Sequence, residues 1–327
     1  MAWTPNPHHD PRAVRAPATE ARAFHEALPG YAPTPVHDLP DVAARAGVAA
    51  VGLKDESDRL GLPAFKVLGA SWAVERTLRE RPEVRELVAA SAGNHGRAVA
   101  HIARRRGLAA RVFLPARARP ARREAIAAEG AEVVVVDGDY EDAVRLAAAA
   151  GRRPGAAEIA DVGTSPPAHW VIDGYATLFA ELVAPAGRWD VLLVPTGVGS
   201  LAAAAARHAA AHDAAVVAVE AATAACLAAS LAAGAPTAVP TPGTAMAGLD
   251  CAEVSAAAWP DLRAGIAATA AVTDAEAAAA LRRLHDLGLR VGECGAAPLA
   301  ALLQEGPRPP LRPSSRVLLV ATEGPTG

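Results

Sequence analysis

Short runs of valine and leucine, each followed by a stretch with helical spacing, recur along this chain of 327 residues. The run VVVV at 133–136 lacks the alternation of apolar and polar residues of a half-exposed strand, so it predicts a strand buried on both faces. Stretches such as 94–106 and 140–151 have helical spacing and lie between such runs. Strands that alternate with helices in this way predict β-α-β units and an α/β fold built on parallel sheets.

The same alternation continues in the second half of the chain, and the length suggests about two domains. We therefore expect two lobes, each a mostly parallel twisted sheet flanked by helices. Residues 70–156 are predicted to form a small α/β lobe. Residues 1–69 together with 157–327 are predicted to form the larger lobe.

Charge and composition exclude several classes of protein. The formal net charge is −3 and 52% of the residues are hydrophobic, so neither a nucleic-acid partner nor intrinsic disorder is indicated. No run of about 20 strongly apolar residues occurs, which argues against a membrane partner. The three cysteines are widely spaced and form no C-x-x-C pair, so we expect no metal site and a cytoplasmic location.

A glycine-rich loop, GVGSL, follows one apolar run and opens an alanine-rich helical stretch; it comprises Gly197, Val198, Gly199, Ser200 and Leu201. Glycines let the backbone approach a ligand closely, and a helix N-terminus offers N–H groups and positive potential. The loop is neither a P-loop nor the dinucleotide fingerprint, because the Gly-Lys-Ser/Thr and the third glycine are missing. By itself it leaves phosphate binding and a tight strand–helix turn both open.

Only two of the 32 lysines and arginines are lysines, namely Lys54 and Lys66. A lysine amine forms Schiff bases and shifts its pKa readily, whereas a guanidinium does neither usefully. Lys66 lies among apolar and small residues in PAFKVLGAS, which leaves a reactive amine and a surface cation both open. Lys54 is flanked by charged residues in LKDESDR, and we interpret it as a solvated or ion-paired residue.

Polar residues also mark other junctions between an apolar run and a turn. In SAGNHG, Asn94 is interpreted either as a helix cap or as a ligand contact, and His95, without a visible partner, as structural. Glu293 and Glu323 each stand between small residues close to an apolar segment. Ligands bind at such strand ends in open α/β sheets.

Pyridoxal phosphate is one cofactor whose binding requirements match this lysine, this glycine loop and these polar residues at strand ends. It requires an amine for its aldehyde, a cradle for its phosphate, a hydrogen bond to its ring oxygen and a partner for its ring nitrogen. The order lysine, S-x-G-N-H-G, G-x-G-S-L, G-E-x-G-A and T-E-G resembles the fold type II pyridoxal-phosphate enzymes of the tryptophan synthase β superfamily. Within that superfamily, diaminopropionate ammonia-lyases are most similar. The similar blocks are FHEALPGYAPTPV, LKDESDRLGLPAFKVLGAS, GNHGRAVA, DGYATLFAEL, MAGLDCAE, GECGA and ATEGPT.

The resemblance implies a role for each matching position. Lys66 would hold the cofactor and, once displaced by substrate, move a proton at Cα. Asn94 would hydrogen-bond the ring hydroxyl oxygen, and the loop 197–201 would bind the phosphate through backbone N–H groups. Thr322 would face the pyridine nitrogen. Asp161 resembles an acidic residue that the family places near the substrate.

The activity implied is removal of ammonia from 2,3-diaminopropionate, or a similar β-substituted amino acid, to give pyruvate. A homodimer acting on a small amino acid is implied as well. A serine/threonine dehydratase or a β-replacement synthase on the same scaffold remains open, as does a non-catalytic cofactor-binding or regulatory protein.

Some positions depart from the lyase pattern. Ala92 replaces the aspartate of T-D-G-N-H-G, a carboxylate associated in that family with the D-enantiomer of the substrate. Cys294 stands where the family usually has serine, and the chain is shorter between Asp161 and Trp170. These departures leave the leaving group and the preferred enantiomer open.

Overall fold

The computed structural model describes residues 3–91, 93–116, 118–183 and 188–325. The chain divides into two compact units. The larger unit contains the described residues within 1–65 and 175–326, and the smaller unit those within 66–174. The sequence predicts boundaries at 69/70 and 156/157. In the structure, residues 66–69 and 157–174 belong to the smaller unit instead of the larger one.

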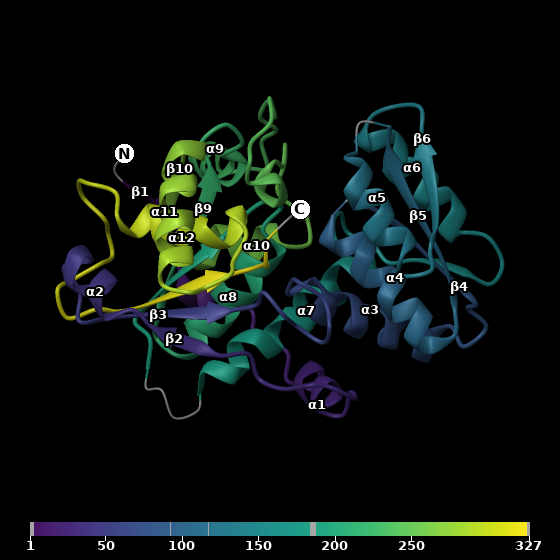
Figure 1. Cartoon of the computed structure of the whole chain (residues 1–327), viewed down its shortest axis with the longest axis horizontal. Helices are drawn as coiled ribbons and strands as arrows, with labels where there is room; N and C mark the ends of the chain where they lie inside the picture. Colours follow the sequence, from purple (N-terminus) through teal and green to yellow (C-terminus); the bar gives the residue numbers. More distant parts are fainter. Residues whose placement is uncertain (1–2, 92, 117, 184–187, 326–327) are drawn as a thin grey trace. The chain divides into compact units, whose positions relative to one another are not determined.

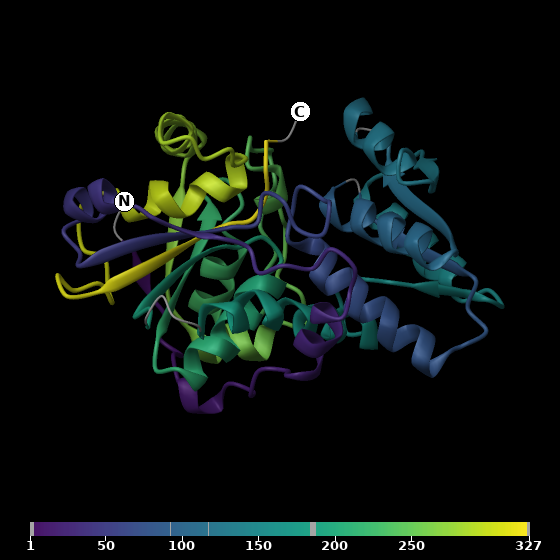
Figure 2. The same ribbon diagram turned by 60° about the horizontal axis from the view of Figure 1, so that its bottom comes forward.

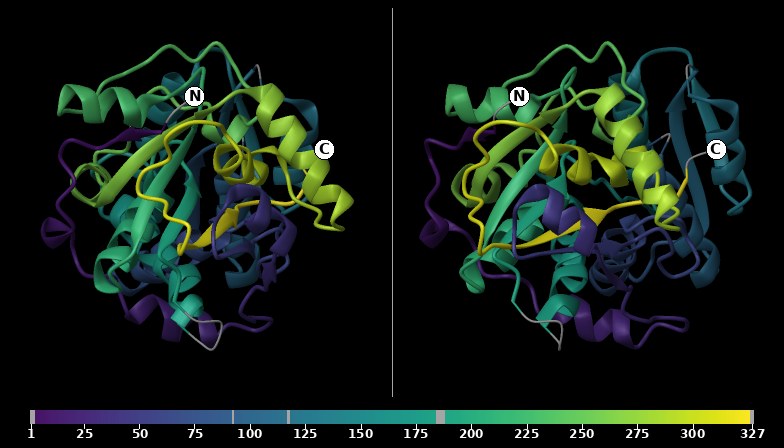
Figure 3. Two further views of the ribbon diagram at one scale, coloured as in Figure 1. Left: turned by 90° about the vertical axis from the view of Figure 1, so that its left-hand side faces the viewer. Right: turned by 60° about the vertical axis from the view of Figure 1, so that its left-hand side comes forward.

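A seven-stranded sheet forms the centre of the larger unit. Its strands, in spatial order, are β1 (Thr4–Pro5), β10 (Ile266–Val272), β9 (Ala215–Ala221), β8 (Val191–Pro195), β11 (Arg316–Ala321), β3 (Ala50–Asp55) and β2 (Val36–Asp38). The five central strands are parallel, and only the edge strands β1 and β2 are antiparallel to their neighbours. The strands fan out with the twist usual for such sheets (Figure 3).

Helices cover both faces of this sheet, with α11 and α12 on one face and α8 and α10 on the other (Figure 2). The helices are α1 (Glu20–Glu26), α2 (Pro40–Ala46), α8 (Ser200–Ala211), α9 (Cys226–Ala233), α10 (Trp259–Gly265), α11 (Asp274–Asp286) and α12 (Glu293–Leu302), with 3-10 turns η1 (Pro11–Ala13), η2 (Glu181–Val183) and η3 (Ala247–Leu249). Because both faces are covered, all five residues of β8 are buried, which is why this strand is continuously apolar.

The smaller unit is a four-stranded, wholly parallel sheet with flanking helices (Figure 1). Its strands, in spatial order, are β6 (Glu132–Val136), β5 (Ala109–Pro115), β4 (Glu86–Ala90) and β7 (Ala156–Glu158). Its helices are α3 (Lys66–Glu80), α4 (Asn94–Arg106), α5 (Pro120–Ala127), α6 (Tyr140–Gly151) and the first part of α7 (Pro166–Ala180). The helices expected at 94–106 and 140–151 are confirmed as α4 and α6.

The expectation that the VVVV run is buried on both faces is wrong. The run belongs to β6, which is an edge strand paired only with β5. Val135 is 46% exposed there, and Val133 and Val134 are only partly buried. Val136 is in the core of the smaller unit and Val134 packs against that core, whereas strand propensity accounts for the more exposed valines, since β-branched residues favour strands.

Parallel pairing within each unit brings particular loops together. In the larger unit, β3, β11 and β8 are neighbours that run in one direction. Their carboxyl ends therefore lead into segment 56–65, Thr322 and the glycine loop at the same sheet edge. In the smaller unit, β4 and β7 are parallel neighbours, and their carboxyl ends lead toward Asn94 and Asp161. Ligands bind at this edge of open α/β sheets.

Candidate active site

Lys66 begins α3, at the first residue of the smaller unit. Its side chain is 21% exposed, and its Nζ donates a hydrogen bond to Asp161 Oδ2 at 3.0 Å. The preceding residue, Phe65, is fixed to the end of β11, because its N–H donates to the Thr322 carbonyl at 3.2 Å. The lysine that the sequence singled out is therefore partly accessible and lies against a carboxylate.

Asp161 lies in a turn shortly after β7 and is buried. The N–H of Ile159 donates to the Val88 carbonyl at 2.8 Å, which extends the contact between the ends of β7 and β4 up to this turn. Burial by itself raises the pKa of the Asp161 carboxyl, but the neighbouring His95 and Lys66 outweigh it and lower that pKa to about 2. Asp161 is therefore an anion at neutral pH.

His95, the second residue of α4, has a partner that the sequence did not reveal. Its Nε2 donates to the Ile159 carbonyl at 2.7 Å, so the neutral ring carries its proton on Nε2. Its Nδ1 lies 3.8 Å from Asp161 Oδ2 and has no hydrogen-bond partner within the described part of the chain. Burial lowers the pKa of His95, so Nδ1 is a proton acceptor beside Asp161 at neutral pH. The Nε2 hydrogen bond agrees with the structural role expected of His95, and Nδ1 adds a proton acceptor beside Asp161.

Asn94 is the first residue of α4 and is half-buried. Gly93 occupies the N-cap position, so the capping role that the sequence left open does not belong to Asn94. The turn before it is tight, because a Cβ on Gly96 would come within 2.5 Å of the Ser91 carbonyl oxygen. Ala92, the residue that bears on the enantiomer preference, lies outside the described residues.

The glycine loop joins β8 to α8, a helix of 12 residues whose first two residues are Ser200 and Leu201. Gly199 has φ +92°, and a Cβ there would come within 2.4 Å of Leu262 Cδ1. A Cβ on Gly197 would come within 2.6 Å of the Gly248 carbonyl oxygen. The Val198 carbonyl accepts the Ser255 N–H at 2.8 Å. Neighbouring backbone and side chains therefore fix the loop at the N-terminus of a helix.

Thr322 follows β11 and is 5% exposed. Cys294, in the first turn of α12, is also buried, and its Sγ accepts the Gly248 N–H at 3.3 Å. Burial, together with the neighbouring Glu323, raises the pKa of the Cys294 thiol well above its usual value. Cys294 is therefore a neutral thiol near the loop, and a serine hydroxyl in its place would present a similar small polar group.

A family model described as "Pyridoxal-phosphate dependent enzyme" matches residues 27–323. The chain belongs to the pyridoxal-phosphate-dependent enzymes. The match includes Lys66, the glycine loop and Thr322, and it covers most of both units.

Curated relatives and solved structures narrow the resemblance within this family. Diaminopropionate ammonia-lyase of Salmonella typhimurium is 33% identical, with 94% of this chain and 89% of that protein covered. A crystal structure of the Escherichia coli diaminopropionate ammonia lyase with an aminoacrylate-PLP azomethine reaction intermediate superposes with a TM-score of 0.86 at 29% identity, covering 96% of this chain and 92% of that one. The biosynthetic L-threonine dehydratase of Escherichia coli is 30% identical, but only 60% of this chain and 35% of that protein are covered.

The residues of this pyridoxal-phosphate enzyme fit its cofactor. The glycine loop offers backbone N–H groups at a helix N-terminus, the kind of position that suits a phosphate. A Cβ at Gly197 or Gly199 would collide with Gly248 or Leu262, so packing within the larger unit holds the loop in this position. Lys66 supplies an amine. No cluster of three metal-binding side chains and no helix able to cross a membrane occurs among the residues that the structure describes.

Replacing Gly199 with alanine is expected to raise the dissociation constant for pyridoxal phosphate by about tenfold or more. The new Cβ would be strained at φ +92° and would push against Leu262, which displaces the loop that begins α8. Absorbance titration of the apo-protein measures this constant. Gly288→Ala is the matched control, since Gly288 also has a positive φ but has nothing within 4 Å of the new Cβ. Equal affinities in the two variants would contradict the phosphate-binding role expected of the loop.

Proposed function

We propose that this enzyme is an ammonia-lyase that converts L-2,3-diaminopropionate and water into pyruvate and two molecules of ammonia. The observation that carries the choice of substrate is the buried Asp161 carboxylate, which is an anion and lies 3.0 Å from Lys66 Nζ. An anion beside the reacting lysine favours a substrate whose side chain carries an ammonium group. The extended similarity to diaminopropionate ammonia-lyases supports the same choice.

We propose the following residues as the cofactor site. Lys66 would hold the aldehyde carbon through Nζ, residues 197–201 would bind the phosphate, Asn94 would donate to the ring hydroxyl oxygen, and Thr322 would face the pyridine nitrogen. Pyridoxal phosphate, when bound, supplies a ring that accepts the electron pair left at the substrate Cα. A hydroxyl such as that of Thr322 does not favour permanent protonation of the ring nitrogen, as a carboxylate would.

The protein's own residues would then move protons and orient the substrate. The Lys66 amine, free once the substrate occupies the site, takes the proton from Cα of an L-substrate. Asp161 orients that amine through its hydrogen bond and attracts the β-ammonium group of the substrate. The β-amino group leaves as ammonia with the electrons of its bond to Cβ, and a double bond forms between Cα and Cβ. Water then hydrolyses the released 2-aminoacrylate to pyruvate and a second ammonia.

Asp161 could instead act as an acid that protonates the leaving amine, but its charge state fits that role less well than the role of attracting the β-ammonium group. With a pKa of about 2, its carboxyl carries almost no proton at neutral pH. An ammonium leaving group already carries the proton it needs, so Asp161 acts best as an electrostatic partner.

Comparison of initial rates on L-2,3-diaminopropionate, L-serine and L-threonine tests this function. Pyruvate or 2-oxobutyrate formation is measured with excess lactate dehydrogenase and NADH. We expect kcat/KM to be highest for L-2,3-diaminopropionate by at least about tenfold, because a charge-assisted contact is worth roughly 1.5–3 kcal/mol. A preference for serine or threonine would favour the dehydratase alternative, and a thiol adduct in place of pyruvate would favour β-replacement. No turnover of any of these would favour the non-catalytic alternative.

We further propose that the enzyme acts as a cytoplasmic homodimer. The wide spacing of the three cysteines suits a reducing compartment. The dimer is proposed from the resemblance to the lyase family alone, and light scattering after size-exclusion chromatography tests it.

A further inference from the structure

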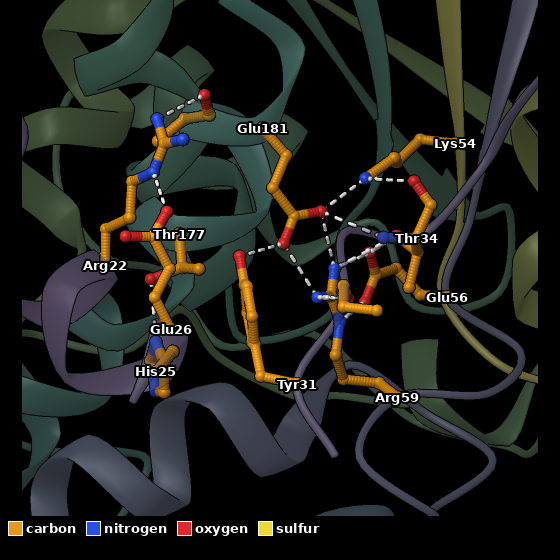
Figure 4. Close-up of polar contacts among 12 residues, drawn as sticks. Arg22, His25, Glu26, Tyr31, Thr34, Lys54, Glu56, Arg59, Thr177 and Glu181 are labelled. Carbon is orange, nitrogen blue, oxygen red and sulfur yellow. Dashed lines mark hydrogen bonds and ion pairs between the residues drawn. The ribbon is translucent and has the colours of Figure 1, made fainter. Parts of the chain in front are cut away.

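Four charged side chains of the larger unit are buried together: Lys54, Glu56, Arg59 and Glu181, none more than 1% exposed. Figure 4 shows them converging from β3, the segment that follows it, and η2. We call these four residues the buried charge cluster. Two cations face two anions, so the cluster is neutral. The expectation that Lys54 is ion-paired is confirmed, but its solvated alternative is wrong.

Arg59 is at the centre of the buried charge cluster. Its Nε and Nη2 donate to Glu56 at 2.8 and 2.6 Å, and its Nη1 and Nη2 donate to Glu181 at 2.7 and 2.9 Å. Lys54 Nζ donates to Glu181 Oε2 and to the Thr34 carbonyl. Burial would raise the pKa of the Glu181 carboxyl, but Arg59 and Lys54 outweigh it and lower that pKa. The buried side chains therefore satisfy one another.

The segment 56–65, which carries Glu56 and Arg59 of the buried charge cluster, leads into Lys66. The N–H of Glu56 donates to the Ala321 carbonyl at 2.9 Å at one end of the segment, and the N–H of Phe65 donates to the Thr322 carbonyl at the other. The Gly324 N–H donates to the Pro63 carbonyl at 3.0 Å. These hydrogen bonds attach the segment to the end of β11 and the residues that follow it. Its last residue, Phe65, precedes Lys66 in the chain.

A strained turn lies in the middle of this segment. Arg59 and Leu62 exchange backbone hydrogen bonds at 2.8 and 3.0 Å around Leu60, which has φ +55°, and Gly61, which has φ +82°. A positive φ is unfavourable for a leucine, so surrounding contacts must maintain it. Arg59 is the first residue of the turn. Its side chain donates hydrogen bonds to Glu56 and Glu181, and these bonds hold that end of the turn in place.

We propose that the buried charge cluster positions the cofactor lysine: Arg59 and Glu181 fix the turn in segment 56–65 and thereby the point from which Lys66 extends. Lys54, Glu56, Arg59 and Glu181 are positioning residues and touch neither cofactor nor substrate. Stability alone is a weak reason for such a cluster, since buried ion pairs often stabilise no better than apolar residues of similar volume. This inference rests on the proposed role of Lys66 in holding pyridoxal phosphate.

The variant Glu181→Gln tests the proposal, because it keeps the shape of the side chain but leaves two buried cations against one anion. We expect the dissociation constant for pyridoxal phosphate to rise by about tenfold or more, with a matching loss of the thermal shift on cofactor binding. The matched control is Leu284→Ala, which removes a fully buried side chain of α11 from the core of the same unit. It should lower the Tm of the apo-protein while changing the cofactor dissociation constant by less than about twofold.

A merely structural role predicts that the two variants bind pyridoxal phosphate with equal affinity at equal loss of apo-protein Tm, and that result would overturn the proposal. If Glu181→Gln does not fold, the affinity of the Tyr31→Phe variant for pyridoxal phosphate tests the proposal instead. This variant removes only the hydrogen bond from the Tyr31 hydroxyl to Glu181 Oε1 at 2.8 Å, and we expect about a threefold weaker affinity. An unchanged affinity in Tyr31→Phe would then overturn the proposal. If the wild type itself forms no bond with pyridoxal phosphate, the role of Lys66 fails instead.

Discussion

Replacing Lys66 with arginine is expected to abolish the absorbance band that pyridoxal phosphate gains on bonding to a lysine amine, and to lower kcat by at least about 1,000-fold. A guanidinium remains protonated at any accessible pH, so it can neither bond to the aldehyde nor take a proton from the substrate Cα. A spectrum of the purified variant at saturating cofactor and a pyruvate assay measure the two effects.

Lys54→Arg is the control for this prediction, because it makes the same chemical change at the only other lysine of the sequence. At saturating cofactor Lys54→Arg should retain the band because Lys66 is still present, although the change within the buried charge cluster is expected to weaken the affinity for the cofactor. Circular dichroism spectra that match those of the wild type would show that Lys66→Arg is folded. A Lys66→Arg protein that keeps the band would exclude Lys66 as the attachment point.

Replacing Asp161 with asparagine is expected to lower kcat/KM for L-2,3-diaminopropionate by about 10- to 100-fold, and for L-serine by clearly less. The variant loses a charge-assisted contact worth roughly 1.5–3 kcal/mol to the β-ammonium group, whereas the serine hydroxyl is neutral. It also loses the anion that orients the Lys66 amine, which affects both substrates. Steady-state rates on the two substrates give the ratio.

Glu158→Gln is the matched control for Asp161→Asn, since it removes a carboxylate from the same segment. The Glu158 backbone and Cβ lie against Gly151 of α6, and burial raises the pKa of its carboxyl. We expect its kcat/KM for both substrates to stay within about twofold of the wild type. Equal losses on the two substrates in Asp161→Asn would mean that Asp161 does not recognise an ammonium group.

The apolar runs predicted the fold well because strands covered on both faces, such as β8, must be continuously apolar. The same rule failed for β6, because an edge strand built of valine has the same local pattern as a central one. The order of strands within a sheet depends on contacts between distant segments, which local sequence does not record. The boundary of the units differed for the same reason, since residues 157–174 belong to the smaller unit.

Local sequence likewise predicted part of the candidate site. Lysine usage pointed to Lys66, and the glycine loop was visible because its glycines and the following helix are contiguous. The hydrogen bond between Lys66 and Asp161 joins residues 95 positions apart, on α3 and after β7, and local sequence does not show that they meet. Local sequence also could not identify Glu181 as the ion-pair partner of Lys54, since the two residues are 127 positions apart.

The most direct test of the proposed reaction is the ratio of ammonia to pyruvate formed from L-2,3-diaminopropionate by the holoenzyme. Elimination of the β-amino group followed by hydrolysis releases both nitrogen atoms of the substrate, so we expect two molecules of ammonia for each pyruvate, at a rate that depends on enzyme concentration. Glutamate dehydrogenase and lactate dehydrogenase assays measure the two products in one reaction mixture. Consumption of substrate without pyruvate, or no release of ammonia above the rate of the Lys66→Arg variant, would contradict the assignment of this chain as an ammonia-lyase.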